Sequence, residues 1–257
     1  MSIRRQTLEE WFLSYQLKKL GKGHFHLPFS LDIDITNIEN AYRSRDKKVP
    51  YTAIVVKGVA LLAKKFPLVN RMLFPTFYGN RIVEFPYVNV NMPIIQHEGG
   101  VPHLSATVVP EADRLRVPDI QNHISDALKR PFSETRIGPL LLNRKNTFFR
   151  RLVLRLLHFT IYNFPGFYVS KKGGGISVSS LLNQHDPDFD FRPVAFGPTA
   201  LTFCMTTVKH NADGRSILKV GVGWDHRCGG GNEYIEALKG LSQIMSAKDN
   251  ETLQKFL

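Results

Sequence analysis

The chain has 257 residues, of which 43% are hydrophobic and 22% are charged, so it is long enough to bury a sizeable core. Two cysteines are too few for a disulfide framework, and we expect neither a signal peptide nor a membrane-spanning helix, because no long apolar run occurs. These features predict a cytoplasmic protein that folds as one domain over residues 1–257.

The net charge of +12 is concentrated in one part of the chain. No acidic residue lies between Glu134 and Asp186. The same segment holds eight basic residues: Arg136, Arg144, Lys145, Arg150, Arg151, Arg155, Lys171 and Lys172. Such a cluster suits the phosphates of coenzyme A, an acidic carrier protein or an anionic membrane surface. We do not expect nucleic acid as a partner, because no zinc-finger, RNP-type or KH-type motif accompanies the charge.

Hydrophobic periodicity divides the first half of the chain into helices and strands. Apolar residues recur at helical spacing in some stretches and alternate or form short runs in others. The predicted helices are 7–20, 52–66 and 117–129, and the predicted strands are 24–36, 81–85, 87–95 and 101–109. His24 and His26 have a spacing that could place them on one strand face. Because no third ligand accompanies them, we expect no metal site.

Residues 148–164 predict a helix of unusual composition. Its apolar residues nearly encircle the helix, and Arg150, Arg151 and Arg155 lie on one side together with His158. An apolar stripe this wide favours burial between two layers. There are two alternatives: the helix docks on a membrane surface, or it lines a pocket for a long acyl chain.

The last third of the chain reads as strands followed by a helix. The predicted strands are 176–182, 200–209 and 216–224, and the predicted helix is 232–245. The last two strands are joined around Asn211 to Gly214 and form a hairpin. The sequence HDPDFDF, from His185 to Phe191, predicts a solvated acidic turn, since it lacks the length and glycine of a calcium loop.

The stretch GVGWDHRCGGG, from Gly221 to Gly231, is the strongest chemical signal. It carries Asp225 and His226 to the end of a predicted strand and then stops at three glycines. Imidazole titrates near neutrality, so a histidine held there is suited to take a proton from a hydroxyl, thiol or amine. A structural role in a glycine-rich turn is the alternative.

Several stretches together resemble the catalytic domain of the dihydrolipoamide acyltransferases of 2-oxoacid dehydrogenase complexes, which share a fold with chloramphenicol acetyltransferase. The matching stretches are HFHLPFSLDID, PYTAIVVKGVALLAKKFPLVN, PYVNVNMPI to VVPEADRLRVPDI, GGGISVSSLL and the DHR-x3-G motif. They occur in the family's order from about residue 24 to residue 245. The resemblance implies an α+β fold with a mixed β-sheet flanked by helices. It is weakest over the basic, apolar segment 131–172.

The resemblance also implies roles for individual residues. His226 corresponds to the base that activates the acceptor for attack on a thioester carbonyl. Ser179 corresponds to the serine that donates a hydrogen bond to the oxyanion, and Ser180 is the adjacent alternative. Asp225 and Arg227 flank the histidine. The family further implies a homotrimer, with the active-site channel between subunits and a coenzyme A thioester as co-substrate.

Two departures from the family pattern are visible in the sequence. The family has HxxxDG, whereas Gly230 stands here at the acidic position. No lipoyl domain and no subunit-binding domain precede the catalytic stretch, so we expect a stand-alone form. Cys228 has no partner of its own that would activate it, and we expect it to be a bystander.

The sequence therefore leads to two hypotheses. The first is an acyltransferase that moves an acyl group from coenzyme A, or from a carrier-protein thioester, to a hydroxyl or amine. The second is a catalytically degenerate scaffold of the same fold, motivated by Gly230. Peripheral membrane contact through residues 148–164 is compatible with either.

Overall fold

The computed structural model describes residues 6–21, 26–142, 147–182 and 199–257. Its helices are α1 (Leu8–Gly21), α2 (Thr36–Arg43), α3 (Tyr51–Lys65), α4 (Val117–Lys129), α5 (Gly138–Leu142), α6 (Thr147–Asn163), α7 (Pro165–Ser170), α8 (Gly231–Ser246) and α9 (Asn250–Gln254). Its strands are β1 (His26–Asp34), β2 (Arg71–Thr76), β3 (Gly79–Glu84), β4 (Val90–Glu98), β5 (Val101–Val109), β6 (Ile176–Ser180), β7 (Leu201–His210) and β8 (Ser216–Asp225). A short 3-10 turn, η4 (His226–Cys228), follows β8.

Six strands form one mixed sheet in the order β1-β8-β7-β6-β4-β5, and β2 and β3 form a separate ribbon. Strand β6 pairs in parallel with both β4 and β7, while the remaining neighbours are antiparallel. The fold class predicted from the sequence, a mixed sheet flanked by helices, is confirmed.

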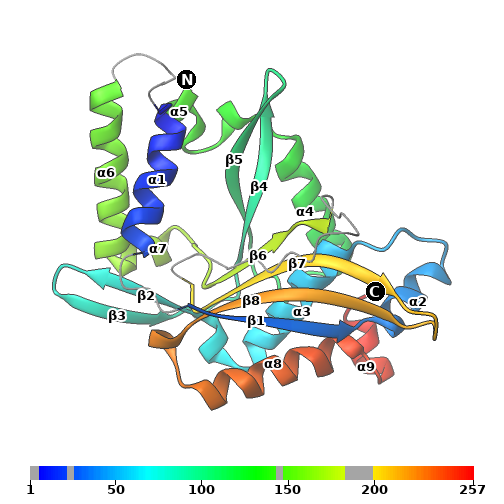
Figure 1. The fold of residues 1–257 in the computed structure, drawn as a ribbon. Coiled ribbons are helices and arrows are strands. Elements are labelled where there is room, and N and C mark those ends of the chain that lie inside the picture. The colour runs from blue at the N-terminus through cyan, green and yellow to red at the C-terminus, as the bar shows by residue number, and fades with distance from the viewer. Residues whose placement is uncertain (1–5, 22–25, 143–146, 183–198) are drawn as a thin grey trace, which may run out of the picture.

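Helices α3, α4 and α8 cover one face of the large sheet, with α8 lying beneath β1 and β8 in Figure 1. The main core lies between this helical layer and the sheet. Every second residue of β8 enters the core, from Leu218 to Trp224, because side chains alternate between the faces of a strand. Small residues take the opposite face at Gly221 and Gly223.

Helices α1 and α6 stand side by side, away from that helical layer, above the β2–β3 ribbon (Figure 1). A small core joins α1 to α5 and α6 through Leu8, Phe12, Leu141 and Leu154, with Phe132 between them. A third cluster joins the ribbon to α6 and α7. This part of the molecule is built from small clusters rather than from one continuous core.

The prediction that residues 148–164 are buried between layers is wrong for this chain. The helix exists as α6, but Leu154 and His158 are its only two buried residues. Phe148 is 84% exposed and Phe149 63% exposed. The helix packs on α1, α7 and β2, and much of its remaining apolar surface is exposed.

Candidate active site

The turn after β8 is braced by a buried ion pair. Asp225 is fully buried, and its carboxylate accepts hydrogen bonds from Arg227 Nε at 2.9 Å and Nη2 at 2.6 Å. The backbone N–H of Arg227 donates to the same carboxylate at 3.1 Å. Separating such a buried pair leaves an uncompensated charge, so the turn is held in one conformation. Asp225 and Arg227 therefore position the residue between them.

That residue, His226, is exposed at the end of the sheet. Its ring stacks on Trp224 at a centroid distance of 5.1 Å, and Trp224 stacks in turn on Phe29 at 5.5 Å. Among the described residues, none forms a hydrogen bond with the His226 ring. The structure thus presents an accessible imidazole on a rigid aromatic support.

The glycines after His226 differ in the space around them. A side chain at Gly229 would come within 2.8 Å of the Tyr234 ring, whereas one at Gly230 would meet only the Glu233 carboxylate, at 3.6 Å. Gly230 is the N-cap of α8 with φ −78°, and its N–H donates to Glu233 at 3.3 Å. The backbone therefore does not require glycine at the position where the related pattern has an acid.

Cys228 lies beside this loop but is only 2% exposed. Burial raises the pKa of its thiol to about 12, so the nucleophilic thiolate is not formed near neutral pH. Its role as a bystander is consistent with this environment.

Ser179 and Ser180 lie on opposite faces of β6. Ser180 is in contact with Thr52 of α3, whose hydroxyl lies 3.4 Å away, so it faces the helical layer. Ser179 faces the other side, beside its register partner Cys204 of β7. Burial raises the pKa of the Cys204 thiol, and the neighbouring Ser179 hydroxyl partly opposes the shift. Of the two serines, Ser179 is the one on the face away from the core.

The sheet register separates Ser179 from His226 within one chain. Ser179 pairs with Cys204, which pairs with Gly221, and His226 lies five positions beyond Gly221. Strand residues advance about 3.4 Å each and neighbouring strands lie about 4.8 Å apart, so the two are roughly 20 Å apart. The structure does not bring these two predicted residues together in a single chain.

The basic residues of the 131–172 segment serve partly as packing groups. Arg151 and Arg155 lie over the Trp11 ring of α1, with guanidinium carbons 5.0 and 5.5 Å from its centroid. Arg150 donates to the Leu140 carbonyl at 2.9 Å. Arg144 and Lys145 lie outside the described residues, as do His24 and the HDPDFDF stretch.

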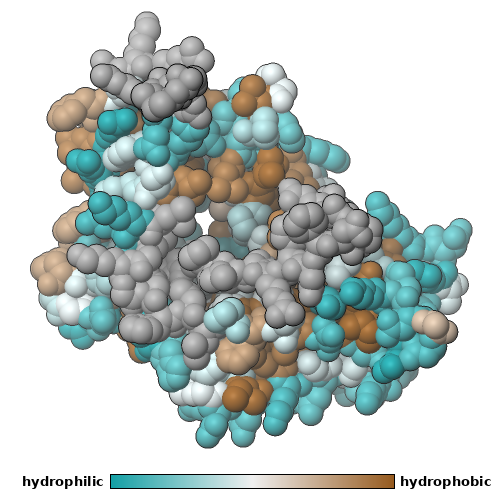
Figure 2. All heavy atoms as spheres, viewed as in Figure 1, coloured by the Kyte–Doolittle hydropathy of each residue, from teal (hydrophilic) through white to brown (hydrophobic). Residues whose placement is uncertain are grey.

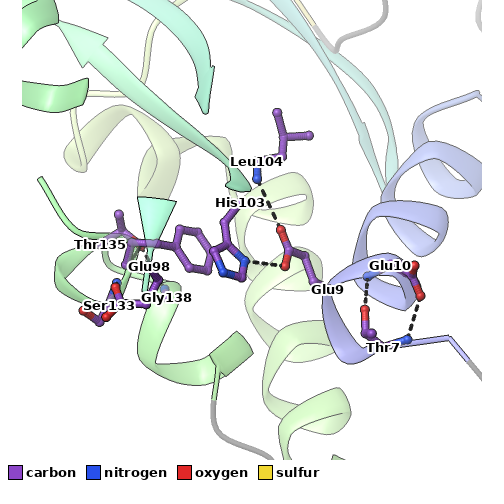
Figure 3. Close-up of polar contacts among 10 residues, drawn as sticks. Thr7, Glu9, Glu10, Glu98, His103, Leu104, Ser133, Thr135 and Gly138 are labelled. Carbon is purple, nitrogen blue, oxygen red and sulfur yellow. Dashed lines mark hydrogen bonds and ion pairs between the residues drawn. The ribbon is translucent and has the colours of Figure 1, made fainter. Parts of the chain in front are cut away.

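A second polar pair was not predicted from the sequence. Glu9 of α1 and His103 of β5 are 94 positions apart, yet Nδ1 of His103 lies 2.8 Å from a Glu9 carboxylate oxygen (Figure 3). They line a cavity of about 1040 Å³ between α1 and the β4–β5 hairpin. No sequence motif links two residues so far apart, so only the tertiary structure reveals this site.

Within the described residues, no group of three metal-ligating side chains occurs. The same residues include no helix with the length and apolarity needed to cross a bilayer.

Comparison with known proteins finds similarity at the level of structure. No protein-family model and no curated protein matches the sequence. The structure resembles the cubic core of the pyruvate dehydrogenase multienzyme complex, with 16% identity, coverage of 99% of this chain and 94% of that chain, and a TM-score of 0.66. It also resembles a probable dihydrolipoamide acetyltransferase from Listeria monocytogenes, with 17% identity, 97% coverage of both chains and a TM-score of 0.66.

A third similar structure is the dihydrolipoamide acetyltransferase of Azotobacter vinelandii, with 16% identity, coverage of 99% of this chain and 94% of that chain, and a TM-score of 0.64. That structure belongs to a study of a serine, a histidine and an asparagine in the enzyme's catalytic mechanism. The chain thus has the fold of the catalytic cores of 2-oxoacid dehydrogenase acyltransferases, as its sequence motifs predicted.

Proposed function

We propose that this protein transfers an acyl group from a thioester of coenzyme A, or of a carrier protein, to a hydroxyl or amine. The observation that carries the proposal is the exposed imidazole of His226, which the Asp225–Arg227 pair fixes at the end of β8. The fold that carries this imidazole resembles that of acyltransferase catalytic cores. Exposure and a fixed orientation are what a general base needs to reach an incoming acceptor.

The reaction proceeds in two steps. The acceptor oxygen or nitrogen loses its proton to His226 and forms a bond to the thioester carbon, and the Ser179 hydroxyl donates to the oxyanion that develops. The intermediate then collapses with cleavage of the carbon–sulfur bond, and the departing sulfur takes the proton back from His226. The products are an ester or amide and a free thiol. Hydrogen-bond donors placed at a developing oxyanion are worth about 3 kcal/mol.

A homotrimer would unite the two residues in one site. Because His226 and Ser179 of one chain lie far apart, we propose that each site takes His226 from one subunit and Ser179 from its neighbour. A head-to-tail interface of this kind closes into a ring and repeats the site at every contact.

Gly230 is compatible with this mechanism. In the Azotobacter vinelandii enzyme, the asparagine under study lies four residues after the histidine, which is the position of Gly230 here. In this chain the Asp225–Arg227 pair already braces the turn. The missing side chain is therefore not needed to hold His226 in place.

Thiol release from a panel of acyl-coenzyme A donors tests the mechanism. His226→Ala should lower the rate by about 10²–10⁴-fold, whereas His97→Ala, a change to an exposed histidine of β4, should not alter it.

Ser179→Ala should lower the rate by about 10²–10³-fold, and Ser177→Ala is its matched control on the same strand face. Full activity in His226→Ala would refute the mechanism, and failure to bind any donor in calorimetry would favour the scaffold.

Co-expression of the two inactive variants tests the shared site. In a mixed oligomer, a Ser179→Ala subunit still supplies His226, and a His226→Ala subunit still supplies Ser179. The active site formed where these two subunits meet in that order is therefore complete. Random mixing would then restore about a quarter of the wild-type activity. No recovery in mixed oligomers would show that both residues must come from one chain.

The C-terminal end of α7 is suited to bind the phosphates of the coenzyme A donor. Lys171 and Lys172 are both exposed there, within the segment that lacks acidic residues. Changing both lysines to alanine should weaken coenzyme A binding in calorimetry, and more so at low salt, since screening reduces such contacts. Unchanged affinity would exclude this position for the phosphates.

We also propose that the outer face of α6 docks on an anionic membrane. This α6 face consists of Phe148, Phe149, Leu152, Leu156 and Phe159, each between 44% and 84% exposed. Figure 2 shows hydrophobic residues along the margin of the molecule occupied by α6 in Figure 1. A helix with such a face and no acidic residue favours anionic lipid.

The tip of the β2–β3 ribbon extends the α6 face. Phe77 is 70% exposed, and its ring lies 6.4 Å from Phe159 and 6.3 Å from Phe164. Arg81 lies over Tyr78 with its guanidinium carbon 5.2 Å from the ring centroid. Aromatic rings next to exposed cations are suited to the boundary between headgroups and acyl chains.

Flotation with phosphatidylglycerol-containing vesicles tests this docking. We expect the protein to float with these vesicles and to remain unbound with pure phosphatidylcholine. Phe148→Ser with Phe149→Ser should abolish flotation, whereas Leu128→Ser, at a 46% exposed leucine of α4, should preserve it. Absence of flotation, or an equal loss in the control, would overturn the proposal, as would burial of the α6 face between two copies of the chain.

A further inference from the structure

The cavity beneath α1 lies along the outer edge of the large sheet. Strand β5 is the edge strand, and α1 runs beside it. The walls are mainly apolar and include Leu8, Phe12, Leu104 and Leu141. At about 1040 Å³, the cavity has the size of sites that bind small organic molecules. Figure 2 shows hydrophobic residues gathered where the middle of the β4–β5 hairpin lies in Figure 1.

Glu9 is held in place by two donors. Its carboxylate accepts from the backbone N–H of Leu104 at 3.2 Å and contacts Nδ1 of His103 at 2.8 Å, as the dashed lines of Figure 3 show. The start of α1 is itself capped by reciprocal hydrogen bonds between Thr7 and Glu10. A fixed helix end therefore delivers the carboxylate to the sheet edge.

The His103 ring is fixed on its other side by stacking. Its plane lies 5° from that of Phe132, with centroids 4.6 Å apart, and Phe132 is fully buried. The segment after Phe132 is tied to the hairpin, because the Ser133 N–H donates to Glu98 at 2.9 Å. The side chain of His103 is only 11% exposed. Stacking and the Glu9 contact together leave the ring little freedom.

The Glu9 contact determines which ring nitrogen of His103 can bind a ligand. A carboxylate only accepts hydrogen bonds, so the proton between the two groups lies on Nδ1 of His103. In the neutral ring Nε2 is then an acceptor, and no described residue donates to it. The cavity wall is mainly apolar but also carries polar side chains such as Gln16 and Ser105, so a fitting ligand combines an apolar body with a polar group.

From this arrangement we infer that the cavity binds a small molecule with an elongated apolar body and a hydroxyl group. The hydroxyl donates to Nε2 of His103, while the apolar body packs on Leu8, Phe12 and Leu141. The site uses neither His226 nor Ser179, so it stands independently of the proposed acyl transfer. Orientation of a histidine by a carboxylate is a frequent device where a single nitrogen must meet a substrate group.

Calorimetry with two probes tests the hydroxyl requirement. 1-Decanol supplies an apolar chain and a donor, and methyl decyl ether supplies the same chain without the donor. We expect the protein to bind the alcohol about tenfold more tightly, since the ether leaves the buried acceptor unpaired. Equal affinities, or no binding of either probe, would overturn the inference.

His103→Phe keeps the stacking on Phe132 and removes both nitrogens. This variant should bind both probes with equal affinity, while the matched control His97→Phe, on the exposed side of the same hairpin, should retain the tenfold preference. In the wild type, 1-decanol should shift the ¹⁵N resonance of His103 Nε2, a readout independent of activity and of stability. An unshifted resonance, or loss of the preference in His97→Phe, would refute the assignment.

Discussion

Helices α3 and α6 are both rich in apolar residues, yet they have opposite environments. In α3, ten of fifteen residues are buried, because the sheet lies on one side and α4 and α8 lie on the others. In α6, only two of seventeen residues are buried. The difference shows that apolar content alone does not decide whether a helix is buried, because burial depends on the elements that pack against it.

The buried polar side chains of α3 and α6 also differ, in whether they have hydrogen-bond partners. Lys57 of α3 donates to the carbonyl oxygens of Asp113 and Leu115, each at 2.7 Å. Burial lowers the pKa of Lys57, but both contacts satisfy its charge. His158 of α6 lies between Tyr15 and Tyr162, and its buried Nε2 has no described hydrogen-bond partner. Lys57 thus finds its partners within the described part of the chain, whereas Nε2 of His158 has none there.

Truncation of matched leucines measures this contrast most directly. Leu62→Ala in α3 should lower the free energy of unfolding by about 2–5 kcal/mol, because Leu62 is fully buried and its loss leaves a cavity. Leu156→Ala in α6, where Leu156 is 56% exposed, should change it by less than about 0.5 kcal/mol. Urea unfolding monitored by circular dichroism provides both values. A comparable loss in Leu156→Ala would mean that the α6 face is covered in the protein's native assembly.

Gly229 and Gly230, at the start of α8, are adjacent in sequence but differ in packing: Gly229 lies against a neighbouring side chain, whereas Gly230 has open space around it. Gly229→Ala should destabilise the protein by about 1–3 kcal/mol, since the new methyl group would overlap the buried Tyr234 ring. Gly230→Asn should instead stabilise it by a few tenths of a kcal/mol, because asparagine is a good N-cap and space is available. Thermal unfolding distinguishes the two, and stabilisation by Gly229→Ala would contradict this account of the loop.

The smallest expected effect is a pH dependence at α6. Burial, and secondarily Lys19, lowers the pKa of His158. The unfolded chain therefore binds a proton more readily than the folded one just below pH 6.5, so stability is full above that pH and falls as the pH decreases through it. His158→Phe should reduce the loss of Tm between pH 7.5 and pH 5, and the exposed His97→Phe should not. Identical pH profiles for wild type and His158→Phe would exclude this contribution.

Local patterns were sufficient for most of the elements. Periodicity predicted α3, α4 and α8 closely, because each has strong apolar spacing and clear ends. It missed β2, whose sequence RMLFPT has a short apolar run without alternation, and the short helices α2, α7 and α9. Such short elements depend on the surfaces they contact more than on their own propensity.

The candidate sites show a similar division. His226 was found because its motif is contiguous in sequence, and the Asp225–Arg227 pair that supports it lies within the same three residues. The distance between His226 and Ser179 depends on strand order and register, which no local motif contains. Their roles as base and oxyanion donor remain predictions.

The sequence by itself determined the main helices, most strands and the histidine at the end of β8, because these follow from side-chain periodicity and short motifs. The mixed sheet was implied by the resemblance to the acyltransferase family. Only the tertiary structure decided that α6 keeps an apolar face outward and that Glu9 meets His103 at the edge of β5. Both depend on contacts between residues far apart in the chain. Such contacts are set by how whole elements pack together, which local sequence does not encode.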